Sequence, residues 1–449
     1  MSLAFGRHAV SIPGPSVIPD RVLGAMHRAA PNIYEGKLIE TTYHVLDRLK
    51  AVARTAGNVA MYISNGHGAW EAALVNTLAP GDRVLVLATG RFGKGWGKMA
   101  EALGLDVEVM DFGTTGPVDL AALSDRLSAD TAGQIRAVMT VQTDTATSVR
   151  NDIAGIRAAL DAAGHGALLL VDCIASLGCE RFEMDAWGVD VMVAGCQKGL
   201  MIPPGAAFVF SGDKAHAARD RLDRVSPYFD WRPRHAPEIY YQLFCGTPPT
   251  HHIFGLEEAL TMLLDEEGLE AAWARHACLA RAVWAAVDAW GQIGEMRCNI
   301  ADRGHRSTAV TAIHTAENAA GQLRTWCEAE ANLTLGIGIS VSDGLAAPTG
   351  DSLFRIGHMG HLNPPMLLGT LGTIDAGLKA LAISHGDGAL AAATAAMVAP
   401  AARGIERAAE YRRAPQGPPG SNGGRKRFAT TLDPITPPEI KDANAEGGA

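Results

Sequence analysis

The chain has 449 residues, of which 47% are hydrophobic and 19% charged, and it carries a formal net charge of −9. Without an excess of basic residues, it is not expected to bind nucleic acid or an anionic membrane. Its apolar runs are too short to span a bilayer and its N-terminus lacks the pattern of a signal peptide, so we expect a cytoplasmic protein. The seven cysteines form no Cys-x-x-Cys pair, which indicates reduced thiols and no zinc or other metal site.

Residues 58–210 alternate short apolar runs with helical segments. The runs are apolar on both faces, which is typical of strands in a mostly parallel sheet that is covered by helices. We therefore predict a large α/β domain with a seven-stranded sheet, whose strands lie at 58–64, 83–88, 105–110, 136–142, 167–172, 189–194 and 206–210. Helices are predicted between them at 67–78, 94–103, 118–128 and 152–163.

The remainder of the chain predicts a second, smaller domain and a tail. Two long helices are expected within 248–293, followed by strands at 307–314 and 352–357 and helices at 317–328 and 365–382. We assign residues 17–295 to the large domain and 296–402 to a smaller C-terminal α/β domain, and we expect the segment 1–16 to pack against the large domain. Residues 415–449 contain six Pro, six Gly and one aromatic residue. We therefore expect 403–449 to be a disordered tail.

Lys198 stands in an unusual place for a lysine. Only nine of the 39 basic residues are lysines, yet this one follows closely on the apolar run 189–194, where a strongly hydrated ammonium group is seldom found. Asp172 ends another apolar run, 167–172. In open α/β sheets the carboxyl ends of the strands border the ligand crevice, so both side chains are expected in one cleft.

A third strand end carries a turn that suits a phosphate group. Residues 64–68, Ser-Asn-Gly-His-Gly, lead into a predicted helix, and the N-terminus of a helix offers free backbone N–H groups. An amine, a carboxylate and a phosphate cradle together fit pyridoxal 5′-phosphate (PLP). Each feature alone has a plainer explanation: a surface lysine, a capping aspartate, or a tight turn that requires glycine.

The sequence resembles the class V branch of the PLP fold type I (aspartate-aminotransferase-like) enzymes, and within it the alanine–glyoxylate and serine–glyoxylate aminotransferases. The two most specific stretches are LLLVDCIASLG (168–178) and DVMVAGCQKGLMIPPG (190–205). Supporting stretches are IPGPSVIP (12–19), SNGHGAWEAALVNTLAPGD (64–82), TGRFGKGW (89–96), CGTPPTHHIFGLEEAL (245–260) and FRIGHMGHLNPP (354–365).

The resemblance implies a role for each matching residue. Lys198 matches the catalytic lysine that carries the cofactor, Asp172 matches the partner of the pyridine nitrogen, and Arg355 matches the arginine that binds the substrate carboxylate. The other implied cofactor contacts are Asn65, Gly66, His67 and Gln197 at the phosphate, Phe92 against the ring, Thr145 near the ring oxygen, and Phe244 and Thr247 from a neighbouring subunit. Relatives have Tyr where Phe244 stands, and the motif around Thr145 reads QTDTATS without the Glu and Gly of relatives.

The implied function is that of a homodimeric aminotransferase with shared active sites. It would move an amino group from serine, alanine or aspartate to glyoxylate or pyruvate by a ping-pong mechanism. One alternative is a PLP-dependent lyase or desulfurase on the same fold, for which Cys173, Cys196 and Cys245 lie near the implied site. A second is transamination of an unusual amine, such as pyridoxamine or an aminophosphonate, and a third is a binding protein that keeps the fold without catalysis.

Overall fold

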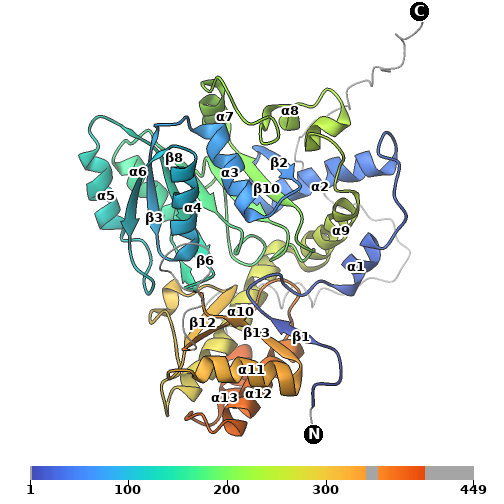
Figure 1. The fold of residues 1–449 in the computed structure, drawn as a ribbon, viewed down its shortest axis with the longest axis vertical. Helices are drawn as coiled ribbons and strands as arrows, with labels where there is room; N and C mark the ends of the chain where they lie inside the picture. The colour runs from blue at the N-terminus through green and yellow to red at the C-terminus, as the bar shows by residue number, and fades with distance from the viewer. Residues whose placement is uncertain (1–2, 340–351, 400–449) are drawn as a thin grey trace, which may run out of the picture.

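The computed structural model describes residues 3–339 and 352–399 (Figure 1). Two β-sheets, each packed with helices, form an upper and a lower unit in that view. The predicted tail at 403–449 lies outside the described residues. None of the helices in the described ranges is long and apolar enough to cross a membrane.

The upper unit is built on a seven-stranded sheet with the strand order β2-β10-β9-β8-β5-β3-β4. Only β10 runs antiparallel to its neighbours. The predicted large, mostly parallel sheet is therefore confirmed. The strands are β2 (Asn58–Tyr62), β3 (Arg83–Ala88), β4 (Asp106–Asp111), β5 (Ile135–Val141), β8 (Leu168–Asp172), β9 (Val191–Gly195) and β10 (Ala207–Ser211).

Both faces of this sheet are covered, as its doubly apolar strands require. Along β3, Leu85 and Leu87 belong to one buried cluster, whereas Val84 and Val86 belong to another on the opposite face. Successive side chains of a strand point to opposite faces, so each face needs its own apolar partners. One layer contains α3 (Gly66–Thr77), α4 (Arg91–Ala102) and α7 (Asp213–Asp220), and the other contains α2 (Lys37–Ala53), α5 (Leu120–Ala129), α6 (Ile153–Ala162) and α9 (Thr250–Leu260).

The lower unit is built on a five-stranded sheet with the order β1-β13-β14-β12-β11. Its strands are β1 (Ala9–Ser11), β11 (Arg297–Cys298), β12 (Val310–His314), β13 (Leu333–Ile337) and β14 (Leu353–Gly357). The helices α11 (Ala319–Ala331), α12 (Pro364–Ala380) and α13 (Ala389–Val398) pack against it. The expectation that residues 1–16 pack against the large domain is wrong for β1, which pairs in parallel with β13.

Helix α10 (Leu269–Trp290) joins the two units. Its first residues, Leu269 and Ala272, belong to the core of the upper unit, whereas the stretch from Leu279 to Trp290 belongs to the core of the lower one. The predicted boundary at residue 295 stays a prediction. The remaining elements are α1 (Asp20–Met26), β6 (Thr143–Asp144), β7 (Val149–Arg150), α8 (Arg232–His235), η1 (Tyr240–Phe244), the π-helical η2 (Thr261–Glu267) and η3 (Arg303–His305).

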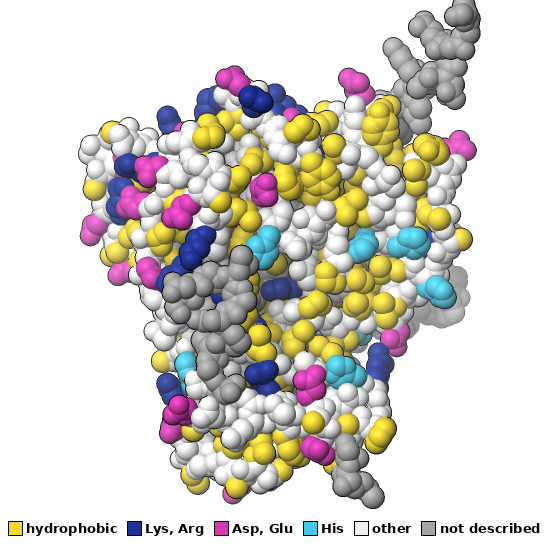
Figure 2. Space-filling view, viewed as in Figure 1, with side chains coloured by type: hydrophobic (Ala, Val, Ile, Leu, Met, Phe, Trp, Pro, Cys, Tyr) yellow, Lys and Arg dark blue, Asp and Glu magenta, His cyan; other side chains and the backbone are white. Residues whose placement is uncertain are grey.

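The surface carries charges of both signs. On the face shown in Figure 2, basic and acidic side chains are interspersed, and hydrophobic side chains gather on the half that holds α2 and α8. Large apolar side chains left exposed include Tyr34 (83%), Tyr241 (57%) and Ile63 (46%).

Candidate active site

A cavity of about 230 Å³ lies at the carboxyl ends of β5 and β8, beside the start of α3. Crevices at this edge of a parallel sheet are the usual ligand sites of such folds. The cavity brings together eight of the residues that the sequence singles out. Its lining consists of Asn65, Gly66, His67, Trp70, Phe92, Val141, Thr143, Thr145, Asp172, Ile174, Ala175, Gln197 and Lys198.

Lys198 is buried at the mouth of the sheet, with 9% of its surface exposed. Burial lowers the pKa of its amine to about 8, although the carboxylate of Asp172 acts in the opposite direction. Its carbonyl oxygen accepts a hydrogen bond of 2.7 Å from Ser16 Oγ, and its side chain packs so closely on Gly14 that a Cβ there would lie 2.8 Å from Lys198 Cε. The packing against Gly14 restricts the side chain, and with a pKa of about 8 roughly a tenth of the amine is neutral at pH 7.

Asp172 is held by two donors at the end of β8. Trp70 Nε1 donates to Oδ2 at 2.8 Å, and the backbone N–H of Ile174 donates to Oδ1 at 2.7 Å. Burial nevertheless raises the pKa of this carboxyl to about 6. Trp70 is a site residue that the sequence motifs do not predict. It follows Gly66 by one helical turn of α3 and so faces the same cavity, and this spacing is the signal that could have revealed it.

The start of α3 forms the predicted phosphate turn. Asn65 caps the helix by accepting a hydrogen bond of 3.0 Å from the backbone N–H of His67. Gly66 is needed for close packing, because a Cβ at this position would collide with Ile174. The His67 ring lies 4.7 Å from the Trp70 ring, and burial lowers the pKa of its imidazole. A neutral ring here leaves the helix N-terminus as the electropositive group of the turn.

Arg355, on the lower unit, does not line the cavity itself but contacts Thr145, which does. It lies on β14 with 6% of its surface exposed, and its guanidinium donates to the carbonyl oxygens of Thr145 and Ile337, each at 2.7 Å. Burial lowers its pKa to about 10. Among the described residues, no carboxylate forms an ion pair with it. A buried, unpaired arginine is a ready partner for an incoming carboxylate.

Asp144 is a second site residue that the sequence motifs do not predict. It is fully buried, and its carboxylate accepts hydrogen bonds from the backbone N–H groups of Phe92 at 2.7 Å and Ala146 at 2.9 Å. It therefore anchors the start of α4 and, with it, the Phe92 ring, whose centroid lies 5.9 Å from Lys198 Nζ. This carboxylate is the third residue of the QTDTATS motif, and it fixes the position of Phe92.

Comparison with known proteins identifies the family. A family model described as aminotransferase class-V matches residues 38–348. The chain belongs to the class V aminotransferases. The serine–glyoxylate aminotransferase of Methylorubrum extorquens is 38% identical over 87% of this chain and 96% of its own length, and the L-aspartate–glyoxylate aminotransferase of Paracoccus denitrificans is 36% identical over 82% and 90%.

Solved structures of PLP fold type I share the architecture of this class V aminotransferase. The pyridoxamine–pyruvate aminotransferase of Mesorhizobium loti superposes with a TM-score of 0.79 at 26% identity, covering 89% of this chain and 100% of that one. The predicted family, fold type and transaminase class are therefore confirmed.

Two residues predicted at the cofactor do not line the cavity of their own subunit. Phe244 is 2% exposed and packs edge-on against Tyr240 in the core of the upper unit; that it contributes to a neighbouring subunit's site stays a prediction. Thr247 is exposed on the loop that follows. That Thr247 reaches a neighbouring site stays a prediction.

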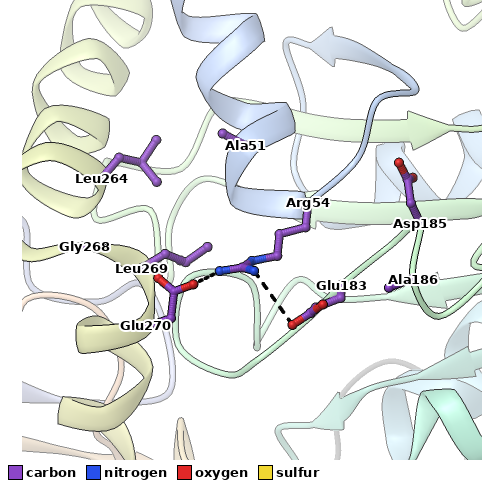
Figure 3. A pocket seen from close by; sticks show the side chains of 9 residues that line it. All are labelled: Ala51, Arg54, Glu183, Asp185, Ala186, Leu264, Gly268, Leu269 and Glu270. Atoms are coloured by element: carbon purple, nitrogen blue, oxygen red, sulfur yellow. Dashed lines mark hydrogen bonds and ion pairs between the residues drawn. The ribbon is translucent and has the colours of Figure 1, made fainter. Parts of the chain in front are cut away.

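The class V aminotransferase has a larger hollow, of about 570 Å³, between the end of α2 and the start of α10 (Figure 3). Arg54 points into it and is bonded to Glu270, and it lies 3.9 Å from Glu183. Because two carboxylates already surround the single arginine, this hollow offers no net positive charge to an anionic ligand. Within residues 3–339 and 352–399, no group of three or more His, Cys, Asp or Glu side chains could hold a metal ion.

Proposed function

We propose that this class V aminotransferase uses PLP to move an amino group from a small amino acid, such as serine, alanine or aspartate, to glyoxylate or pyruvate. The observation that carries the proposal is the pairing of Lys198 and Asp172 in one buried cavity beside the start of α3. The relatives named as serine–glyoxylate and aspartate–glyoxylate aminotransferases support glyoxylate as the acceptor.

The residues of the cavity fit this cofactor. Burial raises the pKa of Asp172 more than its two hydrogen-bond donors and the Lys198 amine lower it, and a protonated pyridine nitrogen would supply a further opposite charge. Asn65, Gly66, His67 and Gln197 would hold the phosphate at the start of α3. The Phe92 ring would lie against the flat heteroaromatic ring.

PLP, when bound, supplies an electron sink that stabilises negative charge at the substrate α-carbon. Lys198 would carry the cofactor through its amine and then move the proton between carbon atoms, for which a pKa of about 8 is well suited. Arg355 would bind the substrate carboxylate and orient the α-carbon toward Lys198. A single site that binds donor and acceptor in turn gives ping-pong kinetics.

We also propose a homodimer with shared sites in a reducing compartment such as the cytoplasm. The exposed apolar side chains Tyr34, Ile63 and Tyr241 support a partner surface. All seven cysteines are free, which supports a reducing compartment. A mixed dimer of Lys198→Ala and Thr247→Arg would regain one intact site if Thr247 serves the partner subunit, whereas each variant alone would stay inactive. Mixed dimers loaded with cofactor but without activity would reject the shared site.

The experiment that tests the function is a panel of amino donors with glyoxylate or pyruvate as acceptor, read by release of the keto acid. The panel includes pyridoxamine, because the structure named as a pyridoxamine–pyruvate aminotransferase is 26% identical. We expect visible absorption from bound PLP, reductive fixation on Lys198, and turnover with serine, alanine or aspartate. Sulfide release from cysteine without transamination would favour a desulfurase, but burial raises the pKa of Cys173 and Cys196 and makes both thiols poor nucleophiles.

A further inference from the structure

Glu180 is a buried carboxylate at the junction of the two units. It follows the turn after β8, and 2% of its surface is exposed. Its Oε1 atom accepts hydrogen bonds from Ser307 Oγ at 2.6 Å and from the backbone N–H of Thr308 at 2.9 Å, and its Oε2 atom accepts one from Thr143 Oγ1 at 3.0 Å. Among the described residues it forms no ion pair. Burying a carboxylate without a cation is costly unless it is hydrogen-bonded, so the folded structure requires these three contacts.

The Oε2 atom of Glu180 is bonded to a residue of the cavity wall, Thr143. Thr143 lines the cavity, as does Thr145 two residues later, and the carbonyl of Thr145 accepts a hydrogen bond from Arg355. The hairpin that carries both threonines is also tied to the lower unit, because Ser307 N donates to Ser148 O at 3.0 Å. Glu180 therefore fixes the wall of the cavity on which the guanidinium rests.

The other side of Glu180 leads to the strand that carries Arg355. Ser307 Oγ accepts hydrogen bonds from the backbone N–H groups of Ala309 and Val310, where β12 begins. In the register of β12 with β14, Ala312 lies opposite Arg355. The side chain of His358, just after β14, also bonds to residues at the start of β12. His358 Nδ1 donates to Thr308 O at 2.9 Å, so its Nε2 accepts from Thr311 Oγ1. Burial lowers the pKa of His358 to about 4, which keeps this ring neutral and the tautomer fixed.

Thr308 is consequently held between the two units. Its N–H is bonded to Glu180 of the upper unit, and its carbonyl is bonded to His358, three residues after Arg355 on the chain. The neighbouring residues Cys179, Ala309, Val310 and Met359 form a buried apolar cluster. Glu180 thus contributes to the position of Arg355 relative to the cavity, although it does not line the cavity itself.

We propose that Glu180 is a positioning residue for substrate binding: it sets the Arg355 guanidinium at the distance from Lys198 that an α-amino acid carboxylate requires. The inference rests on the proposed function, since it assigns the carboxylate to Arg355. Misplacing a binding group by a fraction of an ångström weakens substrate binding and orientation without removing a catalytic group.

The test compares Glu180→Ala, Glu180→Gln and wild-type holoenzyme. Alanine removes all three acceptor contacts, so we expect KM for the amino donor to rise about tenfold while kcat changes by less than about threefold. Glutamine should restore near wild-type values, because its oxygen can accept from Ser307 and Thr308 while its amide donates to the Thr143 hydroxyl. Calorimetric titration with propionate, an unreactive carboxylate, should show the same loss of affinity in Glu180→Ala.

A matched control is Glu183→Ala, which removes a carboxylate three residues away whose partners are Arg181 and Arg54. It should leave KM and the affinity for propionate unchanged. If Glu180→Ala does not fold, Ser307→Ala removes one of the three contacts and should raise KM about threefold. A lower melting temperature with unchanged KM and propionate affinity would reject the positioning role, as would equal losses in Glu180→Gln and Glu180→Ala. Arg355-dependent propionate binding without transamination in the wild type would reject the proposed function and leave the role of Glu180 intact.

Discussion

Replacing the buried lysine should stabilise the protein when no cofactor is bound. Burial lowers the pKa of Lys198 from 10.5 to about 8, and this difference corresponds to about 3 kcal/mol of destabilisation at neutral pH. Lys198→Met keeps the length of the side chain and removes the charge. Because Asp172 loses its attractive neighbour in this variant, we expect a net gain of about 2 kcal/mol, or a rise of roughly 3 °C in melting temperature.

The dependence on pH gives the decisive measurement. The folded pKa is lowered, so the unfolded chain binds the extra proton between pH 8 and 10.5, and wild-type stability rises with pH across that window. The advantage of Lys198→Met over wild type should therefore be full below pH 8 and vanish near pH 10.5. Thermal unfolding of the cofactor-free protein at pH 7, 9 and 10.5 measures it, with Lys379→Met as the control because Lys379 is exposed. If the difference in melting temperature between Lys198→Met and wild type were absent, or constant with pH, the assignment of a buried, poorly solvated amine would be refuted.

Three further substitutions test the site. Trp70→Phe removes one of the two donors to Asp172 and should raise the pKa of that carboxyl further above about 6. The acidic limb of the pH–rate profile should then move to higher pH, and an unchanged limb would contradict this. Asp172→Asn should keep the fold and lower turnover roughly a hundredfold or more, measured by steady-state kinetics, and unchanged turnover would exclude the ring-nitrogen role. Arg355→Lys should raise KM for the amino donor far more than it weakens PLP binding in a fluorescence titration, because a point charge replaces a planar fork, whereas an equal loss of PLP affinity would indicate a structural arginine.

The strands of the upper sheet, and the polar residues at their ends, could be predicted because the sequence pattern that marks them is local. Runs such as VLVLA in β3 and LLLVD in β8 are buried on both faces, so composition alone indicates the sheet. Lys198 and Asp172 stand directly after such runs, and the rule that ligands lie at strand ends brings them together. The turn at Asn65 was equally visible, because a capping residue followed by glycine marks the start of a helix.

What could not be predicted depends on contacts between distant segments. The start of α4 at Arg91, rather than at residue 94, is set by Asp144, which caps it from another strand end. β1 has only three residues and pairs with the distant β13, so it carries no periodic signal of its own. The family resemblance places Phe244 near a neighbouring subunit's cofactor. The packing of its ring against Tyr240 depends on tertiary contacts that the sequence does not reveal.

The pairing of β1 with β13 has a consequence for biosynthesis. Ala9 lies opposite Leu333, so at typical translation rates the first strand waits roughly 15–65 s for its partner to leave the ribosome. During that time the upper unit can assemble its sheet, because all seven of its strands precede residue 212. The segment that follows β1 packs Gly14 and Ser16 onto Lys198. We therefore expect Lys198 to be enclosed only after the lower unit has formed, and its amine to stay open to solvent while the chain is being synthesised.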